Sequence, residues 1–535
     1  MNKNTTNIKR HAYIVGGGIG GLATAFFLLR DGKMSGSDIT IFEELELVGG
    51  SCDGKGTAKE GYLIRGGRML NLPTYECLWA MLMDVPSLND NEVSVYDEVV
   101  EFNRKWKIDV HARLIAKNQQ IVNAKDMQFS VKDKLDLVKL MAVSEHSLGE
   151  KRISECFEAS FFKTNFWYLW ATTFAFQTWH SAVELRRYMY RFMHEFYRIY
   201  NLSGIHRTPY NQYDSFILPI TKHLKKKGVH FKHNCAVTDL VIEEYLSEKK
   251  VTTIKCVDQK NEHSIKLEEN DIVIATIGSM TENSSVGSND LAPKFNIEKL
   301  GHSWQLWKNI AKNRPELGNP DKFICNIDQS FWESFTVTFT DDLILFNNIC
   351  EFSGNLPGTG ALMSLKDSSW LMSTVIAHQP HFINQPENIK VMWGYGLFPN
   401  NIGDHVKKPM RDCSGKEIIA EICYHYNCLD KLERIYKSTK CTPCLMPFIT
   451  SEFMPRLLGD RPQVVPKGYS NLGLIGQYSE IEKDVVFTVE YSVRGAQIAV
   501  YTLLGLSLRE IPEISEHQKE IKVVLESLEA MIRKG

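Results

Sequence analysis

The sequence predicts an α/β protein in which a parallel sheet is interrupted by an inserted helical cap and joined to a second lobe with a mixed sheet. Three observations predict this class. An apolar strand at 12–15 runs through a glycine turn into an amphipathic helix; strand-like segments return at 229–244, 251–258 and 271–278; and a helix-rich, aromatic region (97–200) separates them. We expect the later segments to rejoin the sheet that the first strand begins.

Composition excludes several classes of protein. The chain has 535 residues, 43% hydrophobic and 24% charged, which suits a folded protein of two or three lobes. Lys and Arg total 62 against 64 Asp and Glu, so no positive excess favours nucleic acid. The polar start MNKNTTNIKR lacks the apolar core of a secretory signal, and no run of about 18 apolar residues would span a bilayer. We expect a cytoplasmic protein.

Twelve cysteines lie scattered between Cys52 and Cys444, without the dense spacing of a disulfide framework. One group offers soft metal ligands within a short span: Cys423, His425, Cys428, Cys441 and Cys444. Its spacing does not match a common zinc pattern, and CTPC continues directly into the apolar segment LMPFIT. We predict buried thiols, no disulfides and no metal site.

A glycine fingerprint follows the first strand. Gly16, Gly18 and Gly21 form G-x-G-x-x-G at the start of the first helix. Glycine there allows a tight turn and a close approach of the backbone to a pyrophosphate, whose charge the helix N-terminus favours. Glu43 ends the second strand, where a carboxylate accepts hydrogen bonds from the adenosine ribose, and an acid at that position favours FAD or NAD over NADP.

Two further segments resemble parts of large flavoproteins. The turn LVGGS contains Gly50 and Ser51, and the strand segment DIVIATIG contains Thr276 and Gly278. With the fingerprint, they predict a Rossmann-like FAD-binding flavoprotein fold with a mixed-sheet substrate lobe and an inserted helical cap. The expected segments are the FAD-binding lobe in three parts (1–96, 210–300 and 441–508), the helical cap and substrate region (97–209), the substrate-binding lobe (301–440) and a C-terminal amphipathic helix (509–535).

Long motifs then narrow the prediction to one family. They are RGGRMLNLPTYECLW (65–79), LRRYMYRF (185–192), YNQYDSFILP (210–219), IGSMTENSSVG (277–287), GTGALMSLKDSSWLMS (358–373), HQPHF (378–382), WGYGLFP (393–399), PFITSEFMPR (447–456) and IGQYSEIEKDVVFTVEYSVRGAQIAVYTLL (475–504). Over nearly the whole chain the sequence resembles the oleate hydratase family, once called myosin-cross-reactive antigens, in its RGGRM branch. The resemblance implies an FAD-dependent hydro-lyase that adds water to the cis-9 double bond of oleate and similar fatty acids, giving 10-hydroxy acids.

The resemblance also implies the site residues. Tyr188 matches the family's proton donor, Gln212 a glutamine near the reacting carbons, and His381 a substrate contact. Without the family match, Tyr188 reads as a core tyrosine and His381 as a structural histidine. We expect Arg186 and Arg187 to stabilise the phenolate that donation leaves. The predicted cofactor contacts are Gly16, Gly18, Gly21, Glu43, Glu44, Gly50, Ser51, Arg65, Arg68, Thr276, Gly278, Ser279, Gly476 and Gln477.

The chain departs from the family at three positions. Met69 stands where most relatives carry the glutamate assigned to water activation, and a thioether cannot accept a proton. Backbone carbonyls, flavin oxygens or Asn71 are the alternatives for holding water. Val375 and Ala377 replace polar residues before HQPHF, which predicts an altered preference for the carboxyl end or chain length of the substrate.

Three competing functions use the same fingerprint. A redox flavoenzyme would consume oxygen or a hydride acceptor, a fatty-acid isomerase would lose a different proton, and a noncatalytic lipid- or flavin-binding protein would not turn over. Product analysis separates them. The partner expected is an unsaturated free fatty acid, and the protein is expected to be a monomer or homodimer.

The last segment of the chain predicts an amphipathic helix. Ile521, Val524, Leu525, Leu528 and Ile532 fall near one face at helical spacing. Packing of this face on the protein body or on a second subunit is one reading, and peripheral contact with a membrane surface is the other.

Overall fold

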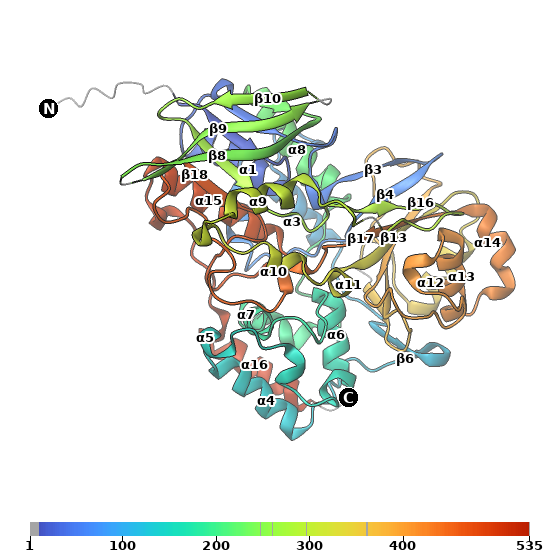
Figure 1. Ribbon diagram of the computed structural model, residues 1–535. Coiled ribbons are helices and arrows are strands. Elements are labelled where there is room, and N and C mark those ends of the chain that lie inside the picture. Colours follow the sequence, from blue (N-terminus) through green and yellow to red (C-terminus); the bar gives the residue numbers. More distant parts are fainter. Residues whose placement is uncertain (1–9, 247, 259–260, 296, 360–361, 534–535) are drawn as a thin grey trace.

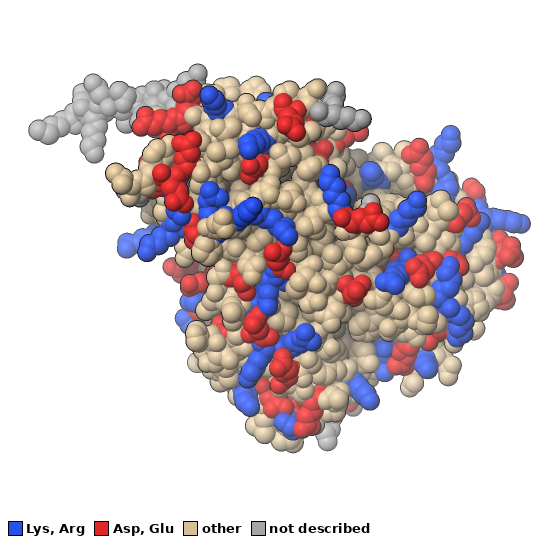
Figure 2. Space-filling view, viewed as in Figure 1, with Lys and Arg blue, Asp and Glu red and all other residues tan. Residues whose placement is uncertain are grey.

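The computed structural model describes residues 10–246, 248–258, 261–295, 297–359 and 362–533. Residues 1–9, on which the expectation about a secretory signal depends, lie outside the described residues. Figure 1 shows three regions: a sheet with its helices at the upper left, a second sheet at the right and a helical region below. Basic and acidic side chains intermingle over the face in Figure 2, in keeping with the near-neutral composition.

A parallel five-stranded sheet forms the first region. Its order is β18 (Leu472–Ile475), β11 (Ile272–Thr276), β1 (Ala12–Val15), β2 (Ile39–Phe42) and β7 (His230–Lys232), with every neighbouring pair parallel. The helices α1 (Ile19–Arg30) and α15 (Val489–Leu504) pack against each other beside it. This parallel sheet with its helices confirms the Rossmann-like α/β class. Its strand β11 is a nearly continuous run of buried apolar residues, which is the pattern of a sheet covered on both faces.

A separate antiparallel sheet corrects one expectation. The strands β8 (Cys235–Glu244), β9 (Lys249–Asp258) and β10 (Asn261–Lys266) pair with one another and do not join the first sheet. Of the strand segments expected to rejoin it, only β7 and β11 do. The burial along β8 gives the physical reason: buried residues are interspersed with partly buried ones from Thr238 onward and the strand ends exposed, which suits a sheet with one solvent-facing side.

The right-hand region is an eight-stranded mixed sheet. Its order is β12 (Ser285–Val286), β17 (Thr439–Met446), β13 (Trp332–Phe339), β16 (Lys390–Gly396), β15 (Met372–Val375), β14 (Leu362–Leu365), β5 (Leu114–Ala116) and β6 (Gln120–Ile121). The β14–β5 pair is parallel and the other pairs are antiparallel, so the predicted mixed sheet is confirmed. Both β5 and β6 come from the segment predicted as a helical cap, which is therefore not wholly helical.

The remaining elements surround these sheets. They are α2 (Glu76–Leu82), α3 (Val95–Lys105), α8 (Leu218–Lys226), α9 (His302–Ala311), α10 (Asp321–Ile324), α11 (Ile327–Ser330), α12 (Ile344–Ser353), α13 (Gly415–His425), α14 (Leu432–Ser438), and the hairpin of β3 (Gly54–Thr57) and β4 (Gly61–Ile64). In Figure 1, α12, α13 and α14 cover the outer side of the mixed sheet. Their apolar side chains form a second core with those of β13.

The helical region carries the helix that positions the predicted acid. It contains α4 (Val131–Ala142), α5 (Glu145–Leu148), α6 (Asn165–Phe174), α7 (Ala182–Arg191) and α16 (Ile521–Ile532). Buried ion pairs join α7 to the segment after β18: Arg187 lies 2.8 Å from Glu480, and Arg191 3.2 Å from Asp484. Separating a buried ion pair would leave uncompensated charges in the interior, which costs free energy. The two pairs therefore hold α7 against this segment.

The C-terminal helix forms as predicted but turns its apolar stripe outward. Val523 and Ala530 pack on the body, whereas Ile521, Leu525 and Ile532 are 60–78% exposed. The reading in which this stripe packs on the protein body is therefore wrong. No helix among the described residues has the length and apolar character needed to cross a membrane.

Candidate functional site

The glycine turn adopts a geometry that other residues would not tolerate. Gly16 has φ +95°, and a Cβ on Gly21 would lie 1.9 Å from the Gly16 carbonyl oxygen. The Glu43 carboxylate accepts hydrogen bonds from the backbone N–H of Gly17 (2.8 Å) and of Leu45 (2.9 Å). The turn is thus held against the end of β2, as a dinucleotide fold requires.

A cavity opens in front of this turn, at the N-terminus of α1. We call it the dinucleotide cavity; the predicted contacts that line it are Gly18, Gly50, Ser51, Arg68, Thr276, Gly278, Ser279, Gly476 and Gln477. A Cβ on Gly18 would meet only the Gly50 Cα, at 3.9 Å, so two glycine backbones form the wall facing the helix N-terminus. That donor set fits the pyrophosphate of a dinucleotide such as FAD.

Five predicted cofactor contacts do not line this cavity. Gly16, Gly21 and Glu43 belong to the turn behind it, and two others lie elsewhere. Glu44 is at the surface, 2.7 Å from His302. Arg65 pairs with Asp53 at 3.1 Å and donates to the Thr281 carbonyl oxygen, so it borders a neighbouring cavity instead. Both assignments followed sequence proximity to motif residues, which does not fix the direction of a side chain.

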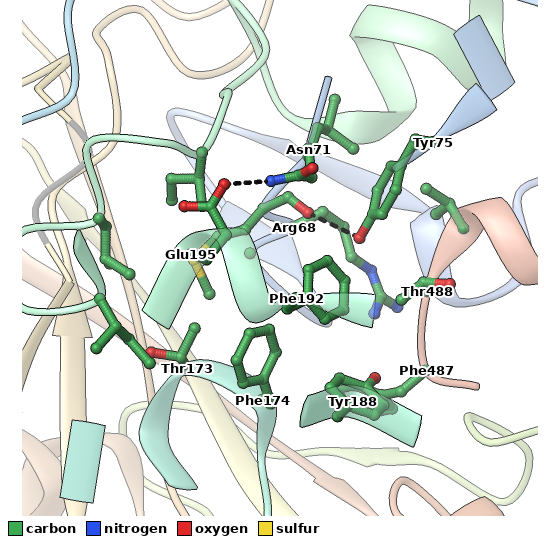
Figure 3. Close-up of a pocket in the computed structure, with 17 residues that line it drawn as sticks. Arg68, Asn71, Tyr75, Thr173, Phe174, Tyr188, Phe192, Glu195, Phe487 and Thr488 are labelled. Atoms are coloured by element: carbon green, nitrogen blue, oxygen red, sulfur yellow. Dashed lines mark hydrogen bonds between the residues drawn. The ribbon is translucent and has the colours of Figure 1, made fainter. Parts of the chain in front are cut away.

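An apolar cavity adjoins the dinucleotide cavity and contains Tyr188 (Figure 3). Its lining includes Phe174, Phe192, Ile199, Leu202 and Ile205, together with Met69 and the polar residues Asn71, Tyr75 and Glu195. Tyr188 is 1% exposed, and its hydroxyl donates to the Val486 carbonyl oxygen at 2.5 Å. Burial raises the pKa of this phenol well above its usual value, so it is protonated at neutral pH.

The polar wall of the apolar cavity brings Asn71, which the sequence suggested as a water holder, together with two groups that the sequence did not suggest, Tyr75 and Glu195. The Tyr75 hydroxyl donates to the Met69 carbonyl oxygen at 3.3 Å, and the Asn71 amide donates to a Glu195 carboxylate oxygen at 2.7 Å (Figure 3). Hydrogen bonds from His194 and Arg198 outweigh burial and lower the Glu195 pKa. Glu195 carried no motif signal, because it reaches the cavity from a 3₁₀ turn after α7.

The expected partners of a Tyr188 phenolate are engaged elsewhere. Arg187 pairs with Glu145 at 2.7 Å and with Glu480. Arg186 lies over the Tyr190 ring, 4.7 Å from its centre. The expectation that Arg186 and Arg187 face the phenol is therefore wrong, because neighbours on a helix point in different directions.

A third cavity is lined by the other predicted substrate contacts. We call it the histidine cavity; Gln212, Val375, Ala377, His378 and His381 line it, with Arg68 and Arg207. The Gln212 amide donates to the Gly66 carbonyl oxygen and accepts from the Arg68 N–H, both at 2.9 Å. Burial lowers the His381 pKa to about 3, so this imidazole is neutral.

A middle cavity lies between these sites. Met69, Arg207, Val375, Trp393 and Tyr395 are among its lining residues. Arg68 borders all four cavities, and Phe487 borders every one except the histidine cavity. Tyr188 and Gln212 thus line different chambers, with Arg68 common to both.

The cysteine group contains free thiols. All twelve cysteines are free, and Cys423, Cys428, Cys441 and Cys444 are buried. His425 points away from them, toward Asp404 and Glu421 at 3.6 and 3.5 Å. Glu421 accepts three backbone N–H groups of residues 404–406, so its carboxylate clamps that loop.

Comparison with known proteins assigns the chain to a protein family. A sequence profile described as the MCRA family matches residues 9–501. The chain belongs to the MCRA family. The family resemblance read from the motifs is thereby confirmed.

Two curated relatives of this MCRA chain carry hydratase names. Oleate hydratase of Streptococcus pyogenes serotype M49 is 38% identical over 529 residues, covering 97% of this chain and 89% of the relative. Linoleate hydratase of Lactiplantibacillus plantarum is 33% identical over 565 residues, covering 98% and 99%. Among solved structures, cyclohexylamine oxidase from Brevibacterium oxydans shares the fold, with a TM-score of 0.52, 12% identity and coverage of 93% of this chain and 99% of that one.

Proposed function

We propose that this MCRA protein is an FAD-dependent fatty acid hydratase that adds water across the cis-9 double bond of oleate and similar acids to give 10-hydroxy acids. One observation carries the proposal: the Tyr188 hydroxyl lies buried in the wall of an apolar cavity that adjoins the dinucleotide cavity. The names and coverage of the two curated relatives support the same chemistry.

The proposed reaction needs a positioned acid, because an isolated alkene is a poor base. Tyr188 gives its hydroxyl proton to C9 while a water oxygen bonds to C10, where cationic character develops. The proton that the water then loses replaces the one that Tyr188 gave, so one H₂O is added and no electrons are transferred. The aromatic and aliphatic lining keeps other water away from the developing cation.

We propose that water is held by the polar wall of the apolar cavity. Met69 presents a thioether and cannot take the proton of the attacking water. Asn71 lines the cavity, and its amide is oriented by Glu195 and His194. Gln212 is proposed to act from the histidine cavity on the bound chain, with His381, Val375 and Ala377 as further substrate contacts.

FAD is proposed to occupy the dinucleotide cavity, with Gly18, Gly50, Ser51 and Gln477 against it and Glu43 at the adenosine ribose. Net hydration transfers no electrons, so the bound cofactor would contribute shape and charge beside the substrate. Arg68 reaches this cavity, where its guanidinium lies 5.8 Å from the Phe487 ring centre and 3.4 Å from the Ser51 carbonyl oxygen.

The proposal is tested by incubating the purified protein with oleate and FAD in heavy-oxygen water, with and without a reductant. A 10-hydroxy acid carrying the label, found by mass spectrometry, is the expected product. A shifted double bond without label would favour an isomerase, and an oxidised lipid a redox flavoenzyme. Unchanged oleate would favour another substrate or a binding role.

We also propose peripheral membrane contact through α16, in a cytoplasmic protein. The outward stripe of Ile521, Leu525 and Ile532 supports it, as do Val131 and Leu135 of α4, which are 75% and 63% exposed. Leu525→Glu should reduce co-sedimentation with phosphatidylglycerol vesicles; undiminished binding would refute the contact. A monomer and a homodimer, the two expected states, differ in sedimentation velocity.

A further inference from the structure

The histidine cavity contains buried nitrogen atoms that have no partner. Trp393 is 4% exposed and His381 8%, and both line this cavity. Among the residues that the structure describes, none hydrogen-bonds to Trp393 Nε1 or to His381 Nδ1. An indole N–H can only donate, so the unpaired Trp393 nitrogen calls for an acceptor from a ligand or a water molecule.

A guanidinium stands beside that indole. Arg207 and Trp393 both line the histidine cavity and the middle cavity, so they share the junction between the two. Arg207 Nη1 donates to the Arg68 carbonyl oxygen at 2.9 Å, which fixes the side chain against the loop at 65–69. Val375, Ile376 and Ala377, which also line the histidine cavity, offer only apolar side chains.

A second buried arginine makes this end of the site more positive. Arg113 is 2% exposed, and its guanidinium donates only to the neutral oxygens of Ser364, Leu169, Thr172 and Thr173. Within the described part of the chain, no carboxylate forms an ion pair with Arg113. Burial and the positive charge of Arg207 lower its pKa to about 10, in keeping with two cations close together.

We propose that Arg207 and Trp393 bind the carboxylate of the fatty acid at this junction, with the guanidinium and the indole N–H as donors. The inference rests on the proposed function in that the ligand is a fatty acid. It adds the orientation of the chain: the carboxylate lies between the histidine and middle cavities, and the hydrocarbon extends past Met69 into the apolar cavity toward Tyr188. Arg113 acts behind them by adding positive potential.

The orientation has a consequence for ligand selection. A carboxylate forms an ion pair with a guanidinium and offers two acceptor oxygens, whereas an alcohol of the same chain length offers one neutral oxygen. The site should therefore prefer oleate to oleyl alcohol through Arg207. The remainder of the chain makes the same apolar contacts in both ligands, so the alcohol serves as a matched probe.

The test measures binding directly, by displacement of a fluorescent fatty acid from the FAD-loaded protein with oleate and with oleyl alcohol. Arg207→Gln should weaken oleate binding about 10- to 100-fold and change oleyl alcohol binding by less than about threefold. Trp393→Phe keeps an aromatic ring and removes the N–H, so a smaller loss is expected, greater for oleate than for oleyl alcohol because the carboxylate is the stronger acceptor. Arg104→Gln, at an exposed arginine paired with Glu101, is the control.

Equal losses for acid and alcohol, or unchanged oleate affinity in both variants, would overturn the inference. Arg207→Lys keeps the charge and should retain part of the preference for the acid, which distinguishes charge recognition from damage to the fold; thermal unfolding checks the fold of each variant. A wild-type protein that binds oleate through Arg207 without hydrating it would refute the proposed function alone. Hydration with Arg207→Gln binding oleate normally would refute this inference alone.

Discussion

The Tyr188 hydroxyl lies 2.5 Å from the Val486 carbonyl oxygen and donates a hydrogen bond to it. Tyr188 belongs to α7 and Val486 to the segment between β18 and α15, two residues before Thr488 in the wall of the dinucleotide cavity. The phenol is therefore held with its proton in place, and substrate must compete with this carbonyl for it.

Replacing the phenol should remove the acid alone. Tyr188→Phe is expected to lower the hydration rate by about 10²–10⁴-fold, the range for loss of a general acid, with FAD affinity unchanged. Turnover of oleate and flavin titration measure the two quantities. Tyr190→Phe is the matched control, because Tyr190 lies on the same helix as Tyr188 but its hydroxyl bonds to the Met141 carbonyl oxygen of α4. Full activity in Tyr188→Phe would refute the assignment.

A carboxylate at position 69 should restore a proton acceptor near the attacking water. Met69 lines both the apolar and the middle cavity, so the side chain of Met69→Glu would face substrate. We expect the fold to be retained and the hydration rate to rise by about 100-fold, at the low end of general-base effects. Met69→Gln has a similar shape without basicity and should not show the gain. Equal rates in all three proteins would mean that this position no longer governs water activation.

Substitutions at two glycines of the fingerprint should have different effects, one on stability and the other on FAD binding. Gly21→Ala places a methyl 1.9 Å from a backbone oxygen, and we expect it to destabilise the fold by about 3 kcal/mol. Gly18→Ala finds only one atom, at 3.9 Å, and should fold normally but bind FAD at least about tenfold more weakly, since its methyl faces the cofactor phosphates. Urea unfolding of the apoprotein and flavin titration separate these outcomes. Normal FAD affinity in Gly18→Ala would contradict the proposed contact between the Gly18 backbone and the cofactor phosphates.

A buried carboxyl group should make stability fall as pH rises. Burial raises the Glu452 pKa to about 8, and one of its oxygens has no partner among the described residues. Between pH 4.5 and 8 the folded chain keeps a proton that the unfolded chain has released, so stability decreases with pH across this window. The free energy of unfolding of Glu452→Gln minus that of wild type should therefore be higher at pH 9 than at pH 5, by on the order of 3 kcal/mol. Urea unfolding at both pH values tests this, and a constant difference would exclude it.

Local sequence patterns were enough to predict the strand–turn–helix unit of the parallel sheet and its cofactor-binding turn. Gly16, Gly18 and Gly21 lie where the fingerprint requires, because a turn between adjacent elements depends on nearby residues. The pairing of β5 with β14 was missed, since its register joins Leu114 to Ser364, some 250 positions away. The assignment of β8 and β9 to the first sheet failed for a different reason, since these strands pair with their neighbours in sequence and keep one face partly exposed.

The site was predictable where a motif residue itself faces a cavity. Tyr188, Met69, Gln212 and His381 all line chambers of the site, although not one common chamber. Side-chain direction was the missing information. Burial of Arg187 against Glu480, and the arrival of Glu195 from a 3₁₀ turn, depend on tertiary contacts that no local spacing encodes.

Arg68 borders all four cavities of the site, so its position bears on the binding of both ligands. Its backbone N–H is held by Gln212 and its carbonyl oxygen by Arg207, while its guanidinium reaches the dinucleotide cavity. Any ligand that displaces this residue changes the wall presented to the other ligand. Thermodynamic reciprocity then requires that whatever factor the cofactor applies to fatty-acid affinity, the fatty acid applies to cofactor affinity. A coupling carried by Arg68 would therefore let the amount of bound fatty acid change how tightly the cofactor is held.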